Sequence, residues 1–171
     1  GQLAGLTLSF FGDGADNMVH SYLLAGATAG MHVRIACPLD YQPDERVIAD
    51  ADAIAARTGG SVTILTDPVE AASGADVIVT DTWVSMGKED EKAARVAALG
   101  QYRVDADLMA LAKLDAVFLH CLPADRGYEV TSEVIDGPQS VIWDEAENRL
   151  HAQKALLVWL LAKADAARAS A

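Results

Sequence analysis

The sequence predicts an α/β protein, with a three-layer, doubly wound, Rossmann-like parallel sheet in a single domain. Short apolar and β-branched runs alternate with alanine-rich segments of helical character, which is the pattern of repeated strand–helix units. Polar residues do not alternate within the apolar runs, as expected of strands that are covered on both faces. The 171 residues suit one domain, and a chain of this size buries roughly 70% of its unfolded surface.

Each element follows from a local signal. Apolar runs predict strands at residues 6–11, 32–36, 62–66, 77–80, 116–119 and 141–143, with Trp143 in the core. Helices are expected at residues 16–29, 43–58, 68–73, 88–99 and 105–112, and a last one at about residues 145–169. Pro43 opens the second helix and Gly59 closes it. The helix at 88–99 is rich in charge and is expected to be exposed.

Composition excludes several classes of protein. The formal net charge of −12 opposes nucleic-acid binding, which needs a basic surface. The longest apolar run, residues 155–162, is too short to cross a membrane. The two isolated cysteines predict no disulfide framework, and the first residues do not resemble a signal peptide, so we expect a cytoplasmic protein. The spacing of the histidines predicts no metal site.

The segment from Phe118 to Pro123 is the most informative in the chain. An apolar strand ends there in His120, Cys121, Leu122 and Pro123. Ligands of open α/β sheets bind at the carboxyl ends of the strands, so this placement is typical of a site. Read alone, it is equally consistent with an inert buried cysteine, and Cys37 is interpreted in that way.

A glycine turn follows the first strand and opens a helix. Gly12 and Gly14 begin a pattern similar to G-x-G-x-x-G, with Asp40 placed where a ribose-binding acid would stand. The third glycine position is Asn17, and the carboxylate of Asp16 would oppose a pyrophosphate. The alternatives are a dinucleotide site, a turn in which Asp16 caps the helix, and a helix N-terminus where Asn17 receives a substrate carboxylate.

The loop after the fourth strand again places polar groups at a carboxyl end. Asp81 and Ser85 stand four residues apart near a helix start. Either side chain can cap that helix, and the two together would suit a substrate ammonium group. The loop by itself does not separate these readings.

Three motifs at one sheet edge together resemble a known family. The sequences His-Cys-Leu-Pro at 120–123, Asp-x-x-x-Ser-Met-Gly at 81–87 and Glu-Ala-Glu-Asn-Arg at 145–149 are similar to the ornithine branch of the carbamoyltransferases. The aspartate branch has proline where Cys121 stands and lacks Ser-Met-Gly. The resemblance runs from about residue 6 to about residue 161. It covers half of the family's protein, because the Ser-x-Arg-Thr-Arg and His-Pro-x-x-Gln motifs of the N-terminal, carbamoyl phosphate-binding domain do not occur here.

The resemblance implies a reaction and a set of partners. Residues 1–171 would be the ornithine-binding domain of a transferase that converts carbamoyl phosphate and L-ornithine to L-citrulline and phosphate, in arginine biosynthesis or the urea cycle. The full protein would be a trimer that uses no cofactor. The last helix would pack on the N-terminal domain, and the ornithine-binding domain alone would be inactive. The competing predictions are a dinucleotide-binding Rossmann module and a non-catalytic amino-acid-binding domain.

The resemblance also implies roles for single residues. Asn17 would hold the α-carboxylate of ornithine, and Asp81 and Ser85 its α-ammonium, with a backbone contact from Met86. Cys121 would lie beside the attacking δ-amine. The other implied roles are these: the Cys121 and Leu122 carbonyls receive the carbamoyl amide, Arg149 polarises the carbamoyl oxygen, and His120 and Pro123 support the loop, with a cis bond before Pro123. Cys121, Arg149 and Asp81 form the implied catalytic set, and Asp16 replaces a second asparagine of many relatives.

Overall fold

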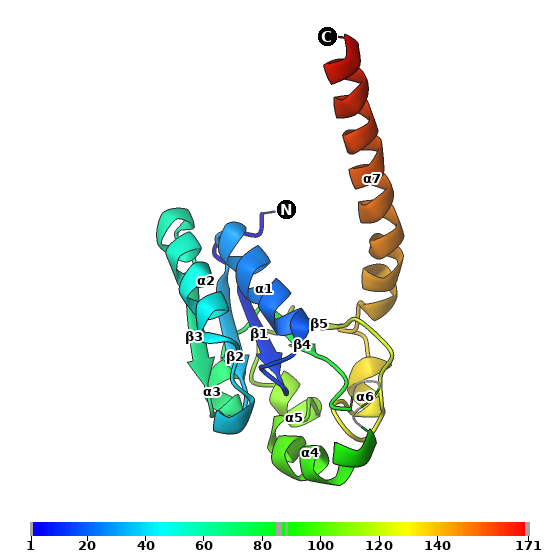
Figure 1. Ribbon diagram of the computed structural model, residues 1–171. Coiled ribbons are helices and arrows are strands. Elements are labelled where there is room, and N and C mark those ends of the chain that lie inside the picture. Colours follow the sequence, from blue (N-terminus) through cyan, green and yellow to red (C-terminus); the bar gives the residue numbers. More distant parts are fainter. Residues whose placement is uncertain (1, 85–86, 88, 170–171) are drawn as a thin grey trace.

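The sheet is parallel throughout and lies between two layers of helices (Figure 1). The computed structural model describes residues 2–84, 87 and 89–169. Within these residues the sheet has five strands in the order β3-β2-β1-β4-β5: β1 (Thr7–Phe11), β2 (His32–Ala36), β3 (Ser61–Leu65), β4 (Val77–Thr80) and β5 (Val117–His120). This order confirms the predicted doubly wound, Rossmann-like fold, in which β1 and β4 mark the point where the chain reverses direction across the sheet.

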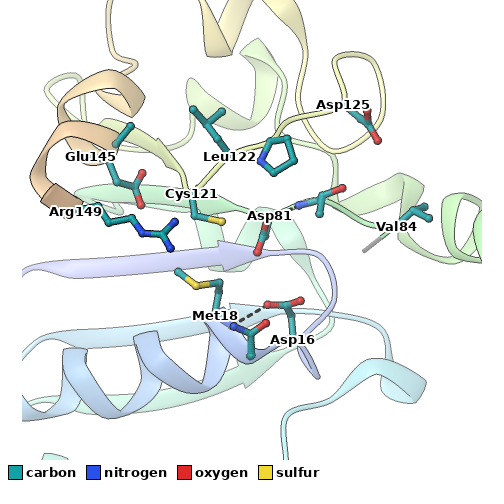
Figure 2. Close-up of a pocket in the computed structure, with 13 residues that line it drawn as sticks. Asp16, Met18, Asp81, Val84, Cys121, Leu122, Asp125, Glu145 and Arg149 are labelled. Carbon is teal, nitrogen blue, oxygen red and sulfur yellow. Dashed lines mark hydrogen bonds between the residues drawn. The ribbon is translucent and has the colours of Figure 1, made fainter. Parts of the chain in front are cut away.

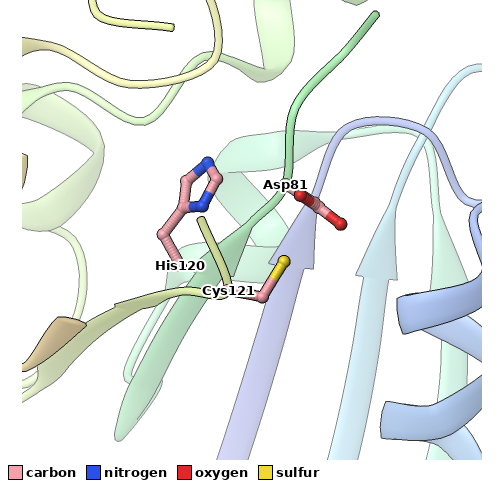
Figure 3. A group of neighbouring side chains, drawn as sticks. All are labelled: Asp81, His120 and Cys121. Carbon is pink, nitrogen blue, oxygen red and sulfur yellow. The ribbon is translucent and has the colours of Figure 1, made fainter. Parts of the chain in front are cut away.

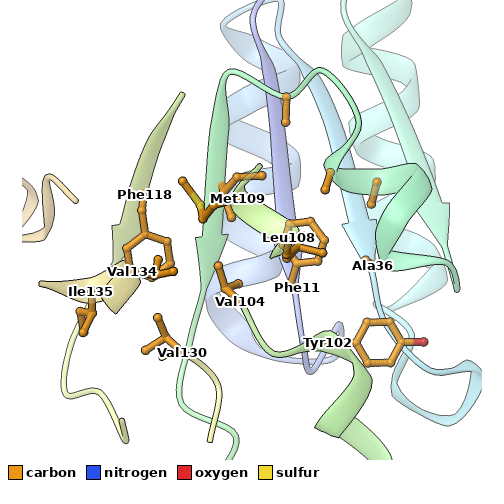
Figure 4. Close-up of a cluster of buried hydrophobic side chains, with 14 of the residues drawn as sticks. Phe11, Ala36, Tyr102, Val104, Leu108, Met109, Phe118, Val130, Val134 and Ile135 are labelled. Atoms are coloured by element: carbon orange, nitrogen blue, oxygen red, sulfur yellow. The ribbon is translucent and has the colours of Figure 1, made fainter. Parts of the chain in front are cut away.

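Two apolar clusters hold the layers together. On one face, α1 (Asn17–Thr28) and α2 (Glu45–Thr58) cover strand residues such as Phe10 and Ile35. On the other face, α3 (Pro68–Ala72), α5 (Ala106–Met109) and α6 (Ser132–Ile135) pack against Phe11 and Phe118 (Figure 4). The remaining elements are η1 (Leu39–Tyr41), η2 (Glu89–Glu91), α4 (Lys92–Leu99), η3 (Gly100–Tyr102) and α7 (Ile142–Ala169).

Aspartate side chains fix where four of the helices begin. Asp16, Asp44, Asp67 and Asp105 precede α1, α2, α3 and α5, and the carboxylate of each accepts a backbone N–H of the first turn at 2.7–3.0 Å. Such caps satisfy N–H groups that have no partner within the helix. The cap by Asp16 confirms one of the readings of the glycine turn. It also fixes the N-terminus of α1 at the carboxyl edge of the sheet.

The segment at 141–143 does not form the predicted sixth strand. Only Ser140 makes an isolated parallel bridge to Phe118, and the chain then turns directly into α7 at Ile142. The prediction that Trp143 lies in the core was also wrong, because 68% of its surface is exposed. Ile142 is the residue of this segment that enters the core. Strand propensity in a short run is easily overridden by packing.

The segment expected as one exposed helix at 88–99 is also different. It divides into η2 and α4, and Lys88 lies outside the described residues. Arg95 on α4 is buried, with 5% of its surface exposed. It forms an ion pair with Asp13 and donates through Nε to the Trp83 carbonyl oxygen. Arg95 therefore ties the glycine turn after β1 to the loop after β4.

Helix α7 projects away from the rest of the domain (Figure 1). With 28 residues it is about 42 Å long. Its large apolar side chains are exposed at Leu150, Leu156, Leu157, Val158, Trp159, Leu160 and Leu161. Apolar residues on all sides are typical of a helix that is buried in a larger core. None of the described helices is both apolar enough and long enough to cross a membrane.

We expect the 171-residue chain to self-associate through α7 at micromolar concentration. Replacing Leu157 and Leu160 with glutamate should make it monomeric, because two charges would then stand on the apolar surface of the helix. Sedimentation velocity measures the outcome. Leu114→Glu is the matched control, since Leu114 is exposed elsewhere on the domain. A monomeric wild-type chain would contradict the prediction.

Candidate active-site cavity

Polar side chains from several segments line a cavity at the carboxyl edge of the sheet (Figure 2). The cavity has a volume of about 650 Å³. Four segments form its wall: the start of α1, the loops after β4 and β5, and the first turns of α7. Its lining residues are Asp16, Asn17, Met18, Asp81, Thr82, Val84, Cys121, Leu122, Pro123, Asp125, Glu145, Ala146 and Arg149.

The structure brings together most of the residues expected at the site. Asn17, Asp81, Cys121, Leu122, Pro123 and Arg149 all line the cavity. Ser85 and Met86 lie outside the described residues. His120 does not reach the cavity, because its side chain is fully buried behind the loop. Sequence reasoning gave no individual role to Glu145, although its place in the Glu-Ala-Glu-Asn-Arg motif was a usable signal.

The histidine ring supports the loop that carries the thiol. The backbone N–H of Leu122 donates to His120 Nδ1 at 2.9 Å, so the ring proton is on Nε2, 3.3 Å from a carboxylate oxygen of buried Glu129. The same Glu129 oxygen accepts the backbone N–H of Asp125. These bonds hold Leu122 at a φ of 60°, a conformation that leucine rarely adopts, and the bond to Pro123 is cis, as expected.

The cavity wall is rich in carboxylates. Asp16, Asp81, Asp125 and Glu145 line it, and Arg149 is the one basic residue among the described lining residues. Burial raises the pKa of both Asp81 and Glu145 above the ordinary range of carboxyl groups. Burial also raises the pKa of Tyr22, whose hydroxyl lies 3.4 Å from Glu145. Such a site favours a ligand that brings positive charge.

The Cys121 thiol is neutral in this environment. Burial, followed by the negative charge of Asp81, raises its pKa to about 12. A thiolate is the reactive form of cysteine, so the cavity suppresses nucleophilic attack by sulfur. Cys37 is fully buried, with a pKa raised by burial to about 11, as expected of a small core residue.

Cys121 is therefore expected to react slowly with iodoacetamide at neutral pH. The Asp81→Asn variant should react faster, because removing this charge lowers the pKa of the thiol. Alkylation rates across a pH series, followed by mass spectrometry of the Cys121 peptide, measure the difference. The Cys37 peptide is the internal control. Equal rates in the two proteins would contradict the electrostatic explanation.

Asp81, His120 and Cys121 also offer one potential metal ligand each, and these three atoms lie within 4.8 Å of one another (Figure 3). A thiolate, an imidazole and a carboxylate together are ligands that zinc accepts. Here, however, both ring nitrogens of His120 are already engaged, because Nδ1 accepts the N–H of Leu122 and Nε2 lies 3.3 Å from Glu129. We therefore assign these residues to the wall and support of the cavity rather than to a metal centre.

The geometry of the glycine turn does not suit a dinucleotide. A side chain at Gly14 would approach the Tyr41 carbonyl oxygen to 2.5 Å and the sulfur of Cys37 to 2.7 Å, so the segment after β2 lies closely against this turn. A pyrophosphate needs open access to such a backbone. Asp40, which would bind the ribose in the dinucleotide alternative, is exposed on η1.

Comparison with known proteins identifies the family. Residues 4–160 match the Asp/Orn binding domain of aspartate/ornithine carbamoyltransferase. The chain is 74% identical over 161 residues to ornithine carbamoyltransferase from Clavibacter michiganensis subsp. michiganensis, a match that covers 94% of this chain and 52% of that protein. It therefore spans about half the length of the curated relatives that it matches.

Solved structures agree with this match. Ornithine carbamoyltransferase from Pyrococcus furiosus has a TM-score of 0.87 at 50% identity, over 91% of this chain and 50% of that one. Acetylornithine transcarbamylase complexed with acetylcitrulline has a TM-score of 0.76 at 34% identity, over 90% of this chain and 48% of that one. The chain belongs to the aspartate/ornithine carbamoyltransferase family, as its Asp/Orn binding domain.

Proposed function

We propose that the cavity binds L-ornithine, and that the longer protein transfers a carbamoyl group from carbamoyl phosphate to the δ-amine of ornithine, giving L-citrulline and phosphate. One observation carries the proposal: Asp81, Cys121 and Arg149, from three separate segments, meet in a cavity rich in carboxylates. Ornithine carries two ammonium groups and one carboxylate at neutral pH, which suits such a wall.

The α-substituents of ornithine would be held at the α1 side of the cavity. Asn17 is the first residue of α1, where a side-chain amide and the positive end of the helix dipole suit the α-carboxylate. Asp81 would receive the α-ammonium, with Ser85 and a backbone contact from Met86. Asp16 already accepts the N–H of Met18 at 2.7 Å. We therefore give Asp16 a capping role and no direct role in binding.

Carbamoyl transfer would take place between Cys121 and Arg149. The δ-amine attacks the carbamoyl carbon, phosphate leaves with the electrons of the broken C–O bond, and the amine loses a proton. An alkyl amine has a pKa of about 10.4, so the site must favour its neutral form. The positive charge of Arg149 disfavours the protonated amine. Arg149 also stabilises the negative charge that develops on the carbamoyl oxygen.

The protonated Cys121 thiol would orient the amine without forming a covalent bond to it. The Cys121 and Leu122 carbonyl oxygens would accept the N–H groups of the carbamoyl amide. His120 would support this loop from behind, and Pro123 would fix its shape from within the cavity wall. The bonds of His120 to Leu122 and to Glu129 support that division of roles.

The remaining parts of the reaction would come from the rest of the longer protein. We propose that residues 1–171 form the ornithine domain, that carbamoyl phosphate binds to the N-terminal half, and that α7 packs on that half. The exposed apolar side chains of α7 support this arrangement. We further propose a cytoplasmic trimer that uses no cofactor, and a chain that is inactive without its other half.

Calorimetric titration of the 171-residue chain tests the ligand. Ornithine is expected to bind weakly, whereas aspartate and putrescine should give no signal, because each lacks one of the groups that the wall would recognise. N-acetylornithine tests the need for a free α-ammonium, and NAD tests the dinucleotide alternative. Tighter binding of aspartate or NAD than of ornithine would overturn the proposal. Citrulline formation by the longer protein, but not by this chain alone, tests the division into halves.

A further inference from the structure

Strand β5 lies at the edge of the sheet, so in the described part of the chain one of its sides has no neighbouring strand. Along a strand, the N–H groups of alternate residues face the same side. In β5 the N–H groups of Phe118 and His120 face the open side. The Phe118 N–H donates to the Gln139 carbonyl at 2.8 Å, and the Phe118 carbonyl accepts the Val141 N–H at 3.0 Å. Backbone pairing then stops, because α7 begins at Ile142.

Beyond Phe118, a side chain instead of a neighbouring backbone accepts the next N–H group of β5. The His120 N–H donates to Glu145 Oε2 at 2.9 Å. The other oxygen, Oε1, lies 3.4 Å from the Tyr22 hydroxyl on α1. One carboxylate on the first turns of α7 therefore joins β5 and α1, at the point where a sixth strand would have continued the sheet.

Two residues of the proposed chemistry depend on this joint. Cys121 follows His120 directly, so fixing the His120 backbone fixes where the thiol begins. Arg149 lies four residues after Glu145, which places both on the same side of α7. Cys121 and Arg149 both line the cavity, and Figure 2 shows their side chains near each other in its wall.

We infer that Glu145 is a positioning residue: its carboxylate takes the place of a missing strand at the β5 edge and so sets the separation of the Cys121 thiol and the Arg149 guanidinium. The placement of these two groups is a property of the fold, and its importance for transfer rests on the proposed function. This role requires a side chain at residue 145 that is long enough to bring an acceptor oxygen to the His120 N–H. It does not require a negative charge.

Two variants distinguish the length of the side chain from its charge. Glu145→Asp keeps the charge but shortens the side chain, so the bond to the His120 N–H is lost. Glu145→Gln keeps the length and one acceptor oxygen but removes the charge. Glu147→Asp is the matched control, because Glu147 lies two residues further along α7 and pairs only with exposed His151 among the described residues.

Amide hydrogen exchange of His120, followed by NMR, is the direct measurement. We expect exchange about tenfold faster in Glu145→Asp, as for the loss of one partly buried hydrogen bond. Glu145→Gln and Glu147→Asp should stay within about threefold of the wild-type rate. The inference would be falsified if Glu145→Gln exchanged as fast as Glu145→Asp, or if neither differed from the wild type.

Ornithine titration of the same variants supplies the functional measurement. We expect affinity to fall about tenfold in Glu145→Asp and clearly less in Glu145→Gln, which loses only the share of this residue in the negative charge of the wall. A purely electrostatic role would give the opposite order, because only glutamine removes the charge, and that order would overturn the inference. If the wild-type chain binds no ornithine, the proposed function fails, while the exchange rates still decide the role of Glu145.

Discussion

Replacing Arg95 with methionine is expected to lower the free energy of unfolding by about 3–5 kcal/mol, as for other buried ion pairs that lose one partner. Arg95 and Asp13 are 5% and 7% exposed. The guanidinium forms an ion pair with the Asp13 carboxylate and also donates to the Trp83 carbonyl oxygen. Methionine keeps most of the packing volume but leaves the Asp13 charge buried without a cation. Urea unfolding followed by circular dichroism measures the loss.

Two further variants test whether the buried charge is the cause. Arg103→Met is the control, since Arg103 is exposed and, among the described residues, donates only to the Gly127 carbonyl oxygen. Its loss should change stability by about 0.5 kcal/mol or less. Adding Asp13→Asn to Arg95→Met should recover part of the stability, because no uncompensated charge then remains. If the double variant were less stable than Arg95→Met alone, the explanation would be wrong.

Arg95 also shows what local sequence reasoning misses. The segment at 88–99 is rich in charge, and charged helices are normally solvated, so an exposed helix was the reasonable expectation. The partner that makes burial possible, Asp13, stands 82 residues away along the chain. Hydrophobic periodicity is read within one segment of the sequence, so it gives no information about an ion pair between two distant segments.

The fold, and the place where many of the candidate site residues lie, were predictable for one shared reason. Uninterrupted apolar runs identify strands covered on both faces, and polar residues such as Asp81 and Cys121 follow two of those runs directly. The carboxyl ends of parallel strands lie at the same edge of the sheet. Residues that follow different strands are therefore predicted to meet there, even when they are far apart in sequence. Asn17 enters the cavity on the same principle, because it begins the helix that follows β1. Arg149 does not, because among the described residues no strand forms directly before α7, and its role was implied only by the family resemblance.

The segment at 141–143 shows where propensity fails. Valine, isoleucine and tryptophan all favour strands, yet only Val141 bonds to the β5 backbone. Asp144 and Glu145 lie in the first turn of α7, where acidic side chains stabilise a helix, and Ile142 is buried in the core. The carboxylate of Glu145 then bonds to the strand in place of backbone. Short apolar runs beside a helix start are therefore poor evidence for a strand.

Replacing Asp81 with asparagine is expected to weaken ornithine binding by about 2–4 kcal/mol, or roughly 30-fold to 1,000-fold, and to make the unliganded chain more stable. Binding weakens because the proposed partner of the α-ammonium loses its charge. Stability rises because burial raises the pKa of Asp81 in the folded state, so ionising it at neutral pH costs folding free energy. Asparagine keeps an acceptor for the Thr82 N–H, which donates to Asp81 at 2.7 Å.

The sign of the stability effect can be followed as a function of pH. Between the ordinary carboxyl pKa and the raised pKa in the fold, the folded chain binds more protons than the unfolded chain, so stability falls as pH rises through that window. Asp81→Asn should flatten this decline and gain about 0.5–2 kcal/mol at neutral pH, as when a destabilising active-site group is removed. Thermal unfolding across a pH series measures both quantities. Asp107→Asn, at an exposed position on α5, is the control that should leave the profile unchanged. A variant that lost binding and stability together would show that Asp81 holds the fold, and the role in binding would need separate proof.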